Sequence, residues 1–266
     1  MSLTEKRNTK TTHIDKASTL EIVNMINEEN MNSVIAVQKA LPEITLVCDA
    51  AALAIQNGGR IIYVGAGTSG RLAVADAAEC PPTFGVDYGT VVAVVAGGKD
   101  AVFRAAENVE DSEEQGKADL LAHNITSDDL VIGISASGNA EYVTAALLTA
   151  KEIGCVTASL SSNKVCKIAD VAELNIFTDT GAEVVTGSTR MKAGNAQKMV
   201  LNMISTTAMI KTGKVYENFM INLRPTNKKL KKRMIGIVRD ILSVDEAMAE
   251  SLLDKNNWSI RQAVGK

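Results

Sequence analysis

Short apolar runs alternate with helical patterns through the middle of the chain. The runs have the length and the Val, Ile and Leu content of buried strands, and they cover residues 61–64, 91–95, 130–134, 156–160 and 174–177. The segments between and after them carry apolar residues at helical spacing, over residues 71–78, 101–109, 113–121, 140–153 and 189–211. This alternation predicts an α/β fold, a three-layer α/β/α sandwich in which helices cover both faces of a mostly parallel, five-stranded sheet.

Proline residues set several of the expected helix ends. Two N-terminal helices, around residues 14–26 and 31–41, are expected to break near Pro42. The helix over residues 71–78 is expected to stop ahead of Pro81 and Pro82 for the same reason. Proline lacks a backbone N–H, so each of these positions is interpreted as a boundary between elements.

After Pro225 the pattern changes to helices alone. An apolar stripe over residues 230–241 predicts one helix, and shorter helices follow at residues 246–253 and 260–264. The chain is therefore expected to have three parts: an N-terminal helical segment (residues 1–42), an α/β domain (residues 43–224) and a small helical C-terminal module (residues 225–266).

Composition and charge narrow the class of protein. Hydrophobic residues make up 46% and charged residues 22% of the 266 positions, the balance of a globular protein rather than of a disordered or fibrous chain. The net charge is −3, with 28 basic and 31 acidic residues, whereas nucleic-acid binders usually carry a basic excess. The basic run at residues 228–233 interleaves with the apolar stripe and is interpreted as a solvated helix face. We expect no nucleic-acid partner.

Cysteine spacing and hydropathy exclude further classes. The four cysteines show neither CxxC pairs nor histidine-rich spacing, so neither a zinc site nor a disulfide framework is predicted. No apolar run approaches the roughly 18 residues that a membrane helix needs. The polar stretch at residues 4–16 lacks the apolar core of a secretory signal. We therefore expect a cytoplasmic protein with no membrane contact and no bound metal.

A glycine-rich turn follows the first predicted strand. Residues 65–70 read GAGTSG and fit the GxGxxG pattern of dinucleotide-binding loops. A dinucleotide site also needs an acidic residue at the end of the next strand, but that strand runs into Ala96, Gly97, Gly98 and Lys99. The Gly-Lys pair of a P-loop is missing as well. The turn therefore argues against nicotinamide, flavin and nucleoside triphosphate ligands.

Hydroxyl side chains stand in two turns that follow predicted strands. Thr68 and Ser69 lie at the start of a predicted helix, where backbone N–H groups bind anions, and Ser135 and Ser137 repeat this chemistry after the third strand. Ligands of open parallel sheets bind at the carboxyl ends of the strands. One such turn could simply cap its helix, but two at equivalent places predict a phosphate or sugar-phosphate site. The candidate binding residues are Gly67, Thr68, Ser69, Ser135, Ser137, Gly138 and Asn139.

Longer motifs resemble one enzyme family. They read YVGAGTSGR at residues 63–71, DAAECPPTFG at 76–85, SASG at 135–138 and GAEVVTGSTRMKAG at 181–194. Through them the chain, up to about residue 226, resembles the N-acetylmuramic acid 6-phosphate etherases of the sugar isomerase (SIS) superfamily. The family's C-terminal helical module is usually longer than residues 225–266.

The resemblance implies an SIS-type sandwich and a specific reaction. The family cleaves the D-lactyl ether of N-acetylmuramic acid 6-phosphate by eliminating lactate and adding water, which yields N-acetylglucosamine 6-phosphate and D-lactate. It implies no metal or organic cofactor, and a place in the recycling of cell-wall amino sugars. The alternative function is that of a non-catalytic phosphosugar-binding regulator of the glucokinase-regulator type, although those chains carry two SIS units.

The resemblance also implies roles for individual residues. By motif position, Glu79 matches the family's proton donor and Glu110 its second catalytic carboxylate, which we expect to be the base. From the residues alone, Glu79 could be a plain helix-end acid, and Glu110 could belong to an exposed acidic helix face. Glu183, Ser188 and Lys192 are further candidates for sugar or phosphate contacts, and Lys192 could equally be a surface lysine.

A homodimer with its active site near the subunit interface is also expected. Related SIS domains usually pair, which is part of the reason. In addition, the predicted helix at residues 189–211 carries apolar residues on more than one face, which indicates burial against a second surface. The alternative is that the C-terminal helices of the same chain cover the extra face.

Overall fold

Five parallel strands form the centre of the computed structural model, which describes residues 3–106 and 108–265. The strands are β1 (Ile61–Gly65), β2 (Val91–Val95), β3 (Leu130–Ile134), β4 (Val156–Ser161) and β5 (Leu174–Phe177). Their order across the sheet is β2-β1-β3-β4-β5, and every neighbouring pair is parallel. The predicted α/β sandwich is confirmed, and each predicted strand lies where the apolar runs placed it.

The central strand β1 is buried on both faces. Ile61 and Tyr63 lie in the core on one side of the sheet, while Ile62 and Val64 lie in the core on the other side. Successive side chains of a strand point to opposite faces. A continuous apolar run is therefore what a strand in the middle of a covered parallel sheet requires.

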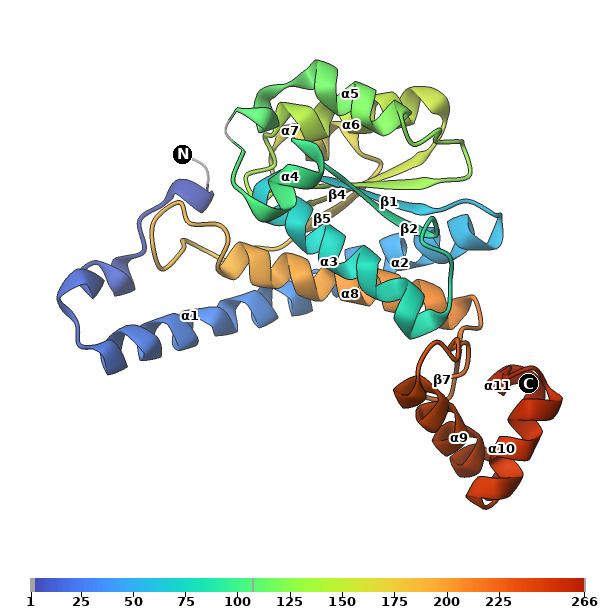
Figure 1. The fold of residues 1–266 in the computed structure, drawn as a ribbon. Helices are drawn as coiled ribbons and strands as arrows, with labels where there is room; N and C mark the ends of the chain where they lie inside the picture. Colours follow the sequence, from blue (N-terminus) through green and yellow to red (C-terminus); the bar gives the residue numbers. More distant parts are fainter. Residues whose placement is uncertain (1–2, 107, 266) are drawn as a thin grey trace.

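Two helical layers cover the sheet (Figure 1). One layer contains α2 (Leu41–Gln56), α3 (Gly67–Phe84) and α8 (Lys192–Lys211). The other contains α5 (Glu113–Leu121), α6 (Glu141–Ile153) and α7 (Lys167–Val171). Helix α8 packs against α2, α3 and α1 (Thr19–Lys39) of the same chain. These elements, rather than the C-terminal helices, cover the second face of α8.

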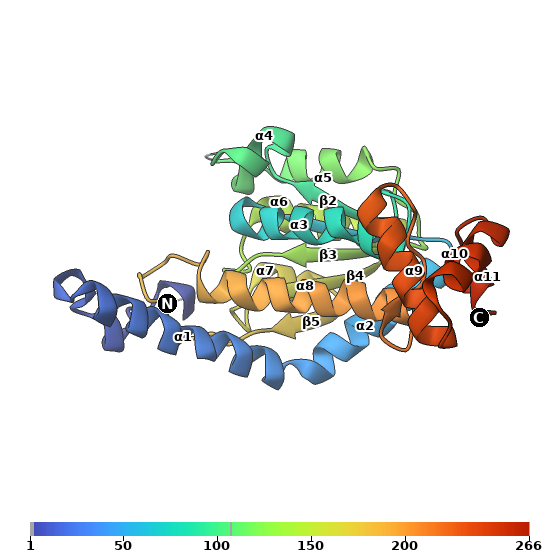
Figure 2. The same ribbon diagram turned by 60° about the horizontal axis from the view of Figure 1, so that its bottom comes forward.

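One long helix replaces the two predicted at the N-terminus. Helix α1 starts at a capping box, in which the Glu21 N–H donates to Oγ of Ser18 and the Ser18 N–H donates to Oε2 of Glu21 at 2.7 Å. The predicted break near Pro42 is confirmed, because α1 ends at Lys39 and α2 begins at Leu41. Pro42 itself lies in the first turn of α2, where a missing N–H costs nothing. Figures 1 and 2 show α1 running alongside α8.

Helix α3 extends through both prolines, so its predicted end is wrong. It continues to Phe84 and stops at Gly85, whose φ of 64° allows its N–H to donate to the Pro81 carbonyl. Pro81 and Pro82 remove donors only near the helix end, and Phe84 is buried in the core. Packing of this last turn outweighs the missing hydrogen bonds.

The helix predicted over residues 101–109 is confirmed only over residues 101–103, and residue 107 lies outside the described residues. Helix α4 (Gly98–Phe103) ends early, and a short 3-10 turn, Val109–Asp111, follows later. Asn108 has a φ of 59°, a left-handed conformation that an α-helix does not accommodate. This irregular segment places Glu110 near Gly67, at the start of α3.

The C-terminal module has a core of its own. Helices α9 (Lys228–Leu242), α10 (Glu246–Lys255) and α11 (Ile260–Ala263) enclose apolar side chains such as Met234 and Leu253. A hairpin of β6 (Val215–Tyr216) and β7 (Phe219–Met220) joins this module to α8, and its very short strands left no signal in the sequence pattern. Among the described residues, no helix is long and apolar enough to cross a membrane.

Candidate active site

The turn after β1 places the start of a helix at the end of a central strand. Strand β1 ends at Gly65, and α3 begins at Gly67, whose φ of 53° lies in the left-handed region. A side chain at Gly70 would place its Cβ 2.8 Å from the Gly65 carbonyl oxygen and 2.7 Å from Cγ1 of Val95. Glycine therefore lets α3 pack directly on the strands. The unpaired N–H groups of its first turn lie at the carboxyl edge of the sheet, as an anion site requires.

Two side chains of this turn lie against α8. Ser69 is buried, and its Oγ donates to Oε1 of Gln197 at 3.0 Å. Thr68 is half-buried, and its methyl group lies 3.5 Å from the position that a Cβ would take at Gly194. Gln197 is not among the residues predicted to form the site. A signal was available, because Gln197 is a polar residue between Ala196 and Val200, which lie on the buried side of α8.

The β3–α6 loop holds its serines through its own backbone. Oγ of Ser135 accepts the Gly138 N–H at 3.0 Å, and Oγ of Ser137 accepts the Asn139 N–H at 3.2 Å. The two Oγ atoms lie 3.3 Å apart, and either can donate to the other. One hydroxyl hydrogen serves that contact, so the other is available to a ligand. Gly138 has a φ of 74°, and a side chain there would overlap Cys166.

The register of the sheet brings these two loops to one place. Gly65 lies level with Ile134 in the β1–β3 pair. From this pair the chain continues to β2 on one side and to β4 on the other, the kind of position at which open α/β sheets bind ligands. The structure thus brings together two sets of predicted binding residues, which are Gly67, Thr68 and Ser69 in one loop and Ser135, Ser137, Gly138 and Asn139 in the other.

Glu110 lies beside the first of these loops. Its side chain is exposed and lines a cavity of about 370 Å³ together with Ala66, Gly67 and Asn108. The sequence alone did not single out Glu110 from its acidic neighbours. The structure places it next to the start of α3.

Glu79 lies elsewhere on the same chain. It is exposed and follows Gly67 by twelve residues on α3, which at a rise of 1.5 Å per residue is about 18 Å. It lines a separate cavity of about 200 Å³ between α3 and α8. Asp76, one turn earlier, accepts a hydrogen bond from Nδ2 of Asn202 at 2.6 Å and so fastens α3 to α8. Within one chain, Glu79 and Glu110 do not line the same cavity.

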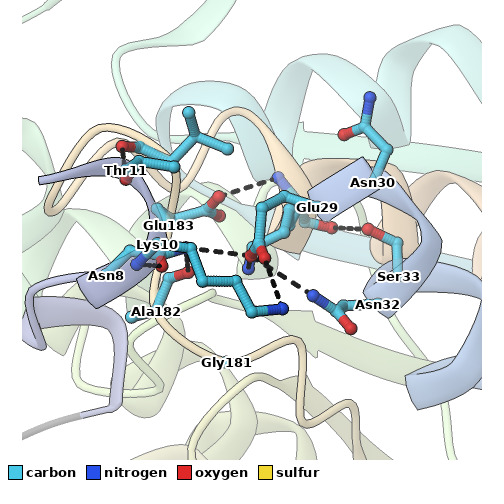
Figure 3. Close-up of polar contacts among 12 residues, drawn as sticks. Asn8, Lys10, Thr11, Glu29, Asn30, Asn32, Ser33, Gly181, Ala182 and Glu183 are labelled. Atoms are coloured by element: carbon cyan, nitrogen blue, oxygen red, sulfur yellow. Dashed lines mark hydrogen bonds and ion pairs between the residues drawn. The ribbon is translucent and has the colours of Figure 1, made fainter. Parts of the chain in front are cut away.

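Lys192 is buried at the start of α8, and Glu183, labelled in Figure 3, is buried beside it. Oε2 of Glu183 accepts the Lys192 N–H at 3.0 Å and Oε1 accepts the Ala193 N–H at 2.9 Å, so this carboxylate caps the helix. The Lys192 side chain is only 1% exposed, and its Nζ donates to Oε2 of Glu29 at 2.5 Å. Lys192 is therefore not a surface lysine. In this structure both residues support the N-terminus of α8.

Glu29 of α1 gathers polar contacts from three parts of the chain, and we call this cluster the Glu29 hub. Oε2 of Glu29 accepts Nδ2 of Asn8 at 2.9 Å and Nδ2 of Asn32 at 3.2 Å, and Oε1 lies 3.2 Å from Nζ of Lys10. Burial by itself would raise the pKa of Glu29, but the bonds from Lys192, Lys10 and Asn8 outweigh burial and hold the pKa below its ordinary value. The hub ties the N-terminal segment and α1 to α8 (Figure 3).

Ser188 lies in the turn that precedes α8. It is half-buried, its N–H donates to the Val185 carbonyl at 2.9 Å, and its own carbonyl accepts the Met191 N–H at 3.2 Å. These backbone bonds shape the turn that leads into α8, the helix that Glu183 caps. In the part of the chain that the structure describes, no cluster of His, Cys, Asp or Glu side chains has the arrangement of a metal site.

Comparison with known proteins identifies the family. The sequence profile of the glucokinase regulatory protein N-terminal SIS domain matches residues 43–151. An N-acetylmuramic acid 6-phosphate etherase from Clostridium beijerinckii is 49% identical over 261 residues, which cover 98% of this chain and 86% of the relative. The chain belongs to the N-acetylmuramic acid 6-phosphate etherase family. Etherases from Oceanobacillus iheyensis (49% identical, 98% and 89% covered) and Salmonella agona (47%, 98% and 88%) support the same assignment. The resemblance inferred from the motifs is confirmed.

Solved structures support the fold of this etherase-family chain. A phosphoheptose isomerase from Neisseria gonorrhoeae superposes with a TM-score of 0.53 at 20% identity, covering 72% of this chain and 98% of the isomerase. A phosphoheptose isomerase from Francisella tularensis gives a TM-score of 0.52, also at 20% identity, over 74% and 99% of the two chains. At this level of identity the likeness extends to the α/β architecture alone.

Proposed function

We propose that this protein cleaves the D-lactyl ether of N-acetylmuramic acid 6-phosphate to give N-acetylglucosamine 6-phosphate and D-lactate. The observation that carries the proposal is the 49% identity to a named etherase over 98% of the chain. We further propose that it acts in the cytoplasm on amino sugars recycled from the cell wall. Its four cysteines are free and buried, which suits a reducing compartment.

The proposed phosphate site lies at the β1–β3 edge of the sheet. The first N–H groups of α3 and the free hydroxyl hydrogen of the Ser135–Ser137 pair supply donors from two adjacent loops, and the Ser69 hydroxyl lies in the first of them. Helix α6 begins directly after the second loop, so two helix N-termini add their positive ends to the same edge. A dianionic phosphate matches this concentration of donors.

Glu110 is proposed as the base that starts the elimination. In the open-chain sugar the aldehyde acidifies the hydrogen on carbon 2. A carboxylate removes this proton, and the resulting enolate expels the lactate oxygen from carbon 3. Water then adds to carbon 3 of the unsaturated aldehyde, and a proton returns to carbon 2. The position of Glu110 beside Gly67 supports this role, because a sugar anchored by its phosphate would extend past that turn.

Glu79 is proposed as the acid that protonates the departing lactate oxygen. An ether oxygen leaves poorly as an alkoxide, so proton transfer during bond cleavage lowers the barrier. Glu79 is exposed at a cavity between α3 and α8, and its neighbour Asp76 is held by hydrogen bonds to α8. This arrangement holds the backbone of α3 rigidly while the Glu79 carboxyl stays accessible to a substrate.

A second copy of the chain is proposed to complete the site. Since Glu79 and Glu110 line different cavities of one chain, a partner packed on the α3–α8 side would supply its Glu79 to the sugar held beside Glu110. Exposed apolar side chains border this side. Leu46 and Leu53 of α2 are 57% and 56% exposed and lie seven residues apart on one helix face, and Met203 of α8 is 36% exposed. Apolar surface of this kind favours protein–protein contact.

The alternative function is phosphosugar binding without turnover. The match of residues 43–151 to a domain of a glucokinase regulatory protein favours this alternative. A regulator would bind the phosphosugar at the same strand-end loops as the enzyme. Purified protein incubated with N-acetylmuramic acid 6-phosphate separates the two. The etherase releases D-lactate in proportion to time and protein, whereas a regulator binds the sugar and releases none.

A further inference from the structure

Gln197 is the feature of the site that the proposed chemistry does not use. It lies in the second turn of α8 and is 1% exposed. Its Oε1 accepts the Ser69 hydroxyl, and its Nε2 has no hydrogen-bond partner. Among the described residues, this Nε2 is the one buried side-chain nitrogen or oxygen that lacks a partner. An unpaired buried donor is costly, so its position directly beside a predicted phosphate ligand calls for a reason.

The orientation of the Gln197 amide decides what Ser69 can offer to a ligand. With Oε1 toward Ser69, the only hydroxyl hydrogen of Ser69 points at Gln197, and Ser69 presents lone pairs to an incoming phosphate. If the amide turns by about 180°, Nε2 donates to Oγ of Ser69 and the Ser69 hydrogen becomes free. The same turn leaves a carbonyl oxygen, rather than an N–H, without a partner.

We propose that Gln197 is a positioning residue whose amide turns when the phosphate binds and thereby makes Ser69 a hydrogen-bond donor to it. Nε2 is itself enclosed, so it acts through Ser69 rather than on the ligand. A Cβ at Gly194 would lie only 3.5 Å from the Thr68 methyl group, so the starts of α3 and α8 lie close together beside Gln197. The inference rests on the proposed phosphosugar site and adds to it a residue that positions Ser69 without contacting the ligand.

A double-mutant cycle tests whether Gln197 acts on phosphosugar binding through Ser69. The dissociation constant of N-acetylglucosamine 6-phosphate is measured by calorimetry for the wild type, Ser69→Ala, Gln197→Leu and the double variant. We expect Ser69→Ala to weaken binding about tenfold or more, as for a lost bond to a charged group. Gln197→Leu should weaken it severalfold in the wild-type chain and leave Ser69→Ala nearly unchanged. Equal effects of Gln197→Leu in both backgrounds would overturn the proposal, because the residue would then act independently of Ser69.

Two further variants distinguish the proposed action of Gln197 through Ser69 from a purely structural role of Gln197. Gln197→Glu has acceptors on both sides and holds the Ser69 hydrogen permanently, so it should bind the phosphosugar at least as poorly as Ser69→Ala. Ser205→Ala removes another buried hydrogen bond of α8, to Asp76, and should lower the melting temperature without changing phosphosugar affinity. Tight binding by Gln197→Glu would contradict the inference.

NMR spectroscopy follows the Gln197 side-chain amide directly. The side-chain amide resonance of Gln197, assigned by its loss in Gln197→Leu, should shift when inorganic phosphate or the phosphosugar is added. It should not shift in Ser69→Ala at matched occupancy. If the wild-type resonance stays in place while phosphate binds, the amide does not turn and the inference fails. Normal lactate release in that case would leave the etherase function intact, whereas a coupled shift without lactate release would overturn the function alone.

Discussion

Four glutamates that look alike in the sequence fall into two different pairs in the structure. Glu79 and Glu110 are exposed, and each lines a cavity. Glu29 and Glu183 are buried, and both oxygens of each accept hydrogen bonds or face an ammonium group. A buried carboxylate must be saturated in this way because desolvation of a charge is costly. Glu29 and Glu183, whose oxygens already accept hydrogen bonds, stabilise the fold. The exposed carboxylates of Glu79 and Glu110 are accessible to a substrate.

The largest expected effect comes from the exposed pair. Glu79→Gln should slow lactate release by about 100- to 10,000-fold, because general acid assistance is worth that much. The free energy of unfolding should change by less than about 0.5 kcal/mol, as for other surface substitutions. Glu152→Gln, an exposed acid on α6, is the matched control and should keep full activity. A loss below tenfold in Glu79→Gln would reject its role as the acid.

Glu110→Gln should separate proton abstraction from product release. If Glu110 is the base, exchange of the carbon-2 hydrogen of N-acetylglucosamine 6-phosphate with deuterated water should stop in this variant. Proton NMR of the sugar follows the exchange directly, and binding of the sugar should persist. Exchange at the wild-type rate would mean that another group removes the proton.

Mixing the two inactive variants tests whether two chains share each site. In a hybrid dimer of Glu79→Gln and Glu110→Gln, one site receives both changes and the other receives neither. Random exchange of subunits should then restore about a quarter of wild-type activity. If both carboxylates came from one chain, every site would keep one defect and the mixture would stay inactive. Light scattering provides the parallel check, since a mass fixed at 28.2 kDa at all micromolar concentrations would rule out the dimer.

The sequence predicted the strands well because their burial is continuous and local. It misplaced helix ends wherever distant packing decided them: Phe84 is held by the core, so α3 passes two prolines. The motifs located both hydroxyl loops. The partners of Lys192 and Glu183 could not be foreseen, because Glu29 lies 163 residues from Lys192 and reaches it only through the packing of α1 on α8. Likewise, nothing local indicated that Ser69 would contact Gln197.

The buried pair should affect stability rather than chemistry. Glu29→Ala leaves Lys192 charged and enclosed, and removal of one partner of a buried ion pair typically costs about 3–5 kcal/mol. Thermal or urea unfolding measures this loss. Combining Glu29→Leu with Lys192→Met removes both charges and should recover much of it. If the double variant were no more stable than Glu29→Ala, the unpaired charge would not be the cause.

The smallest expected effect is a dependence on pH. The folded protein holds the pKa of Glu29 below its ordinary value of 4.5, so the carboxylate contributes stability above that pH. This contribution should disappear as the pH falls from about 4.5 through the folded-state pKa. Comparing urea unfolding of the wild type and Glu29→Gln across this range isolates it. The stability difference between the two should shrink toward low pH, and a constant difference would show that Glu29 does not titrate with folding.

Oxygen labelling tests the proposed reaction most directly. The purified protein is incubated with N-acetylmuramic acid 6-phosphate in water enriched in oxygen-18, and both products are weighed by mass spectrometry. Elimination followed by addition of water places one heavy oxygen on carbon 3 of N-acetylglucosamine 6-phosphate and none in D-lactate. Label in the lactate would mean that the other carbon–oxygen bond of the ether breaks, and the absence of both products would contradict the etherase function itself.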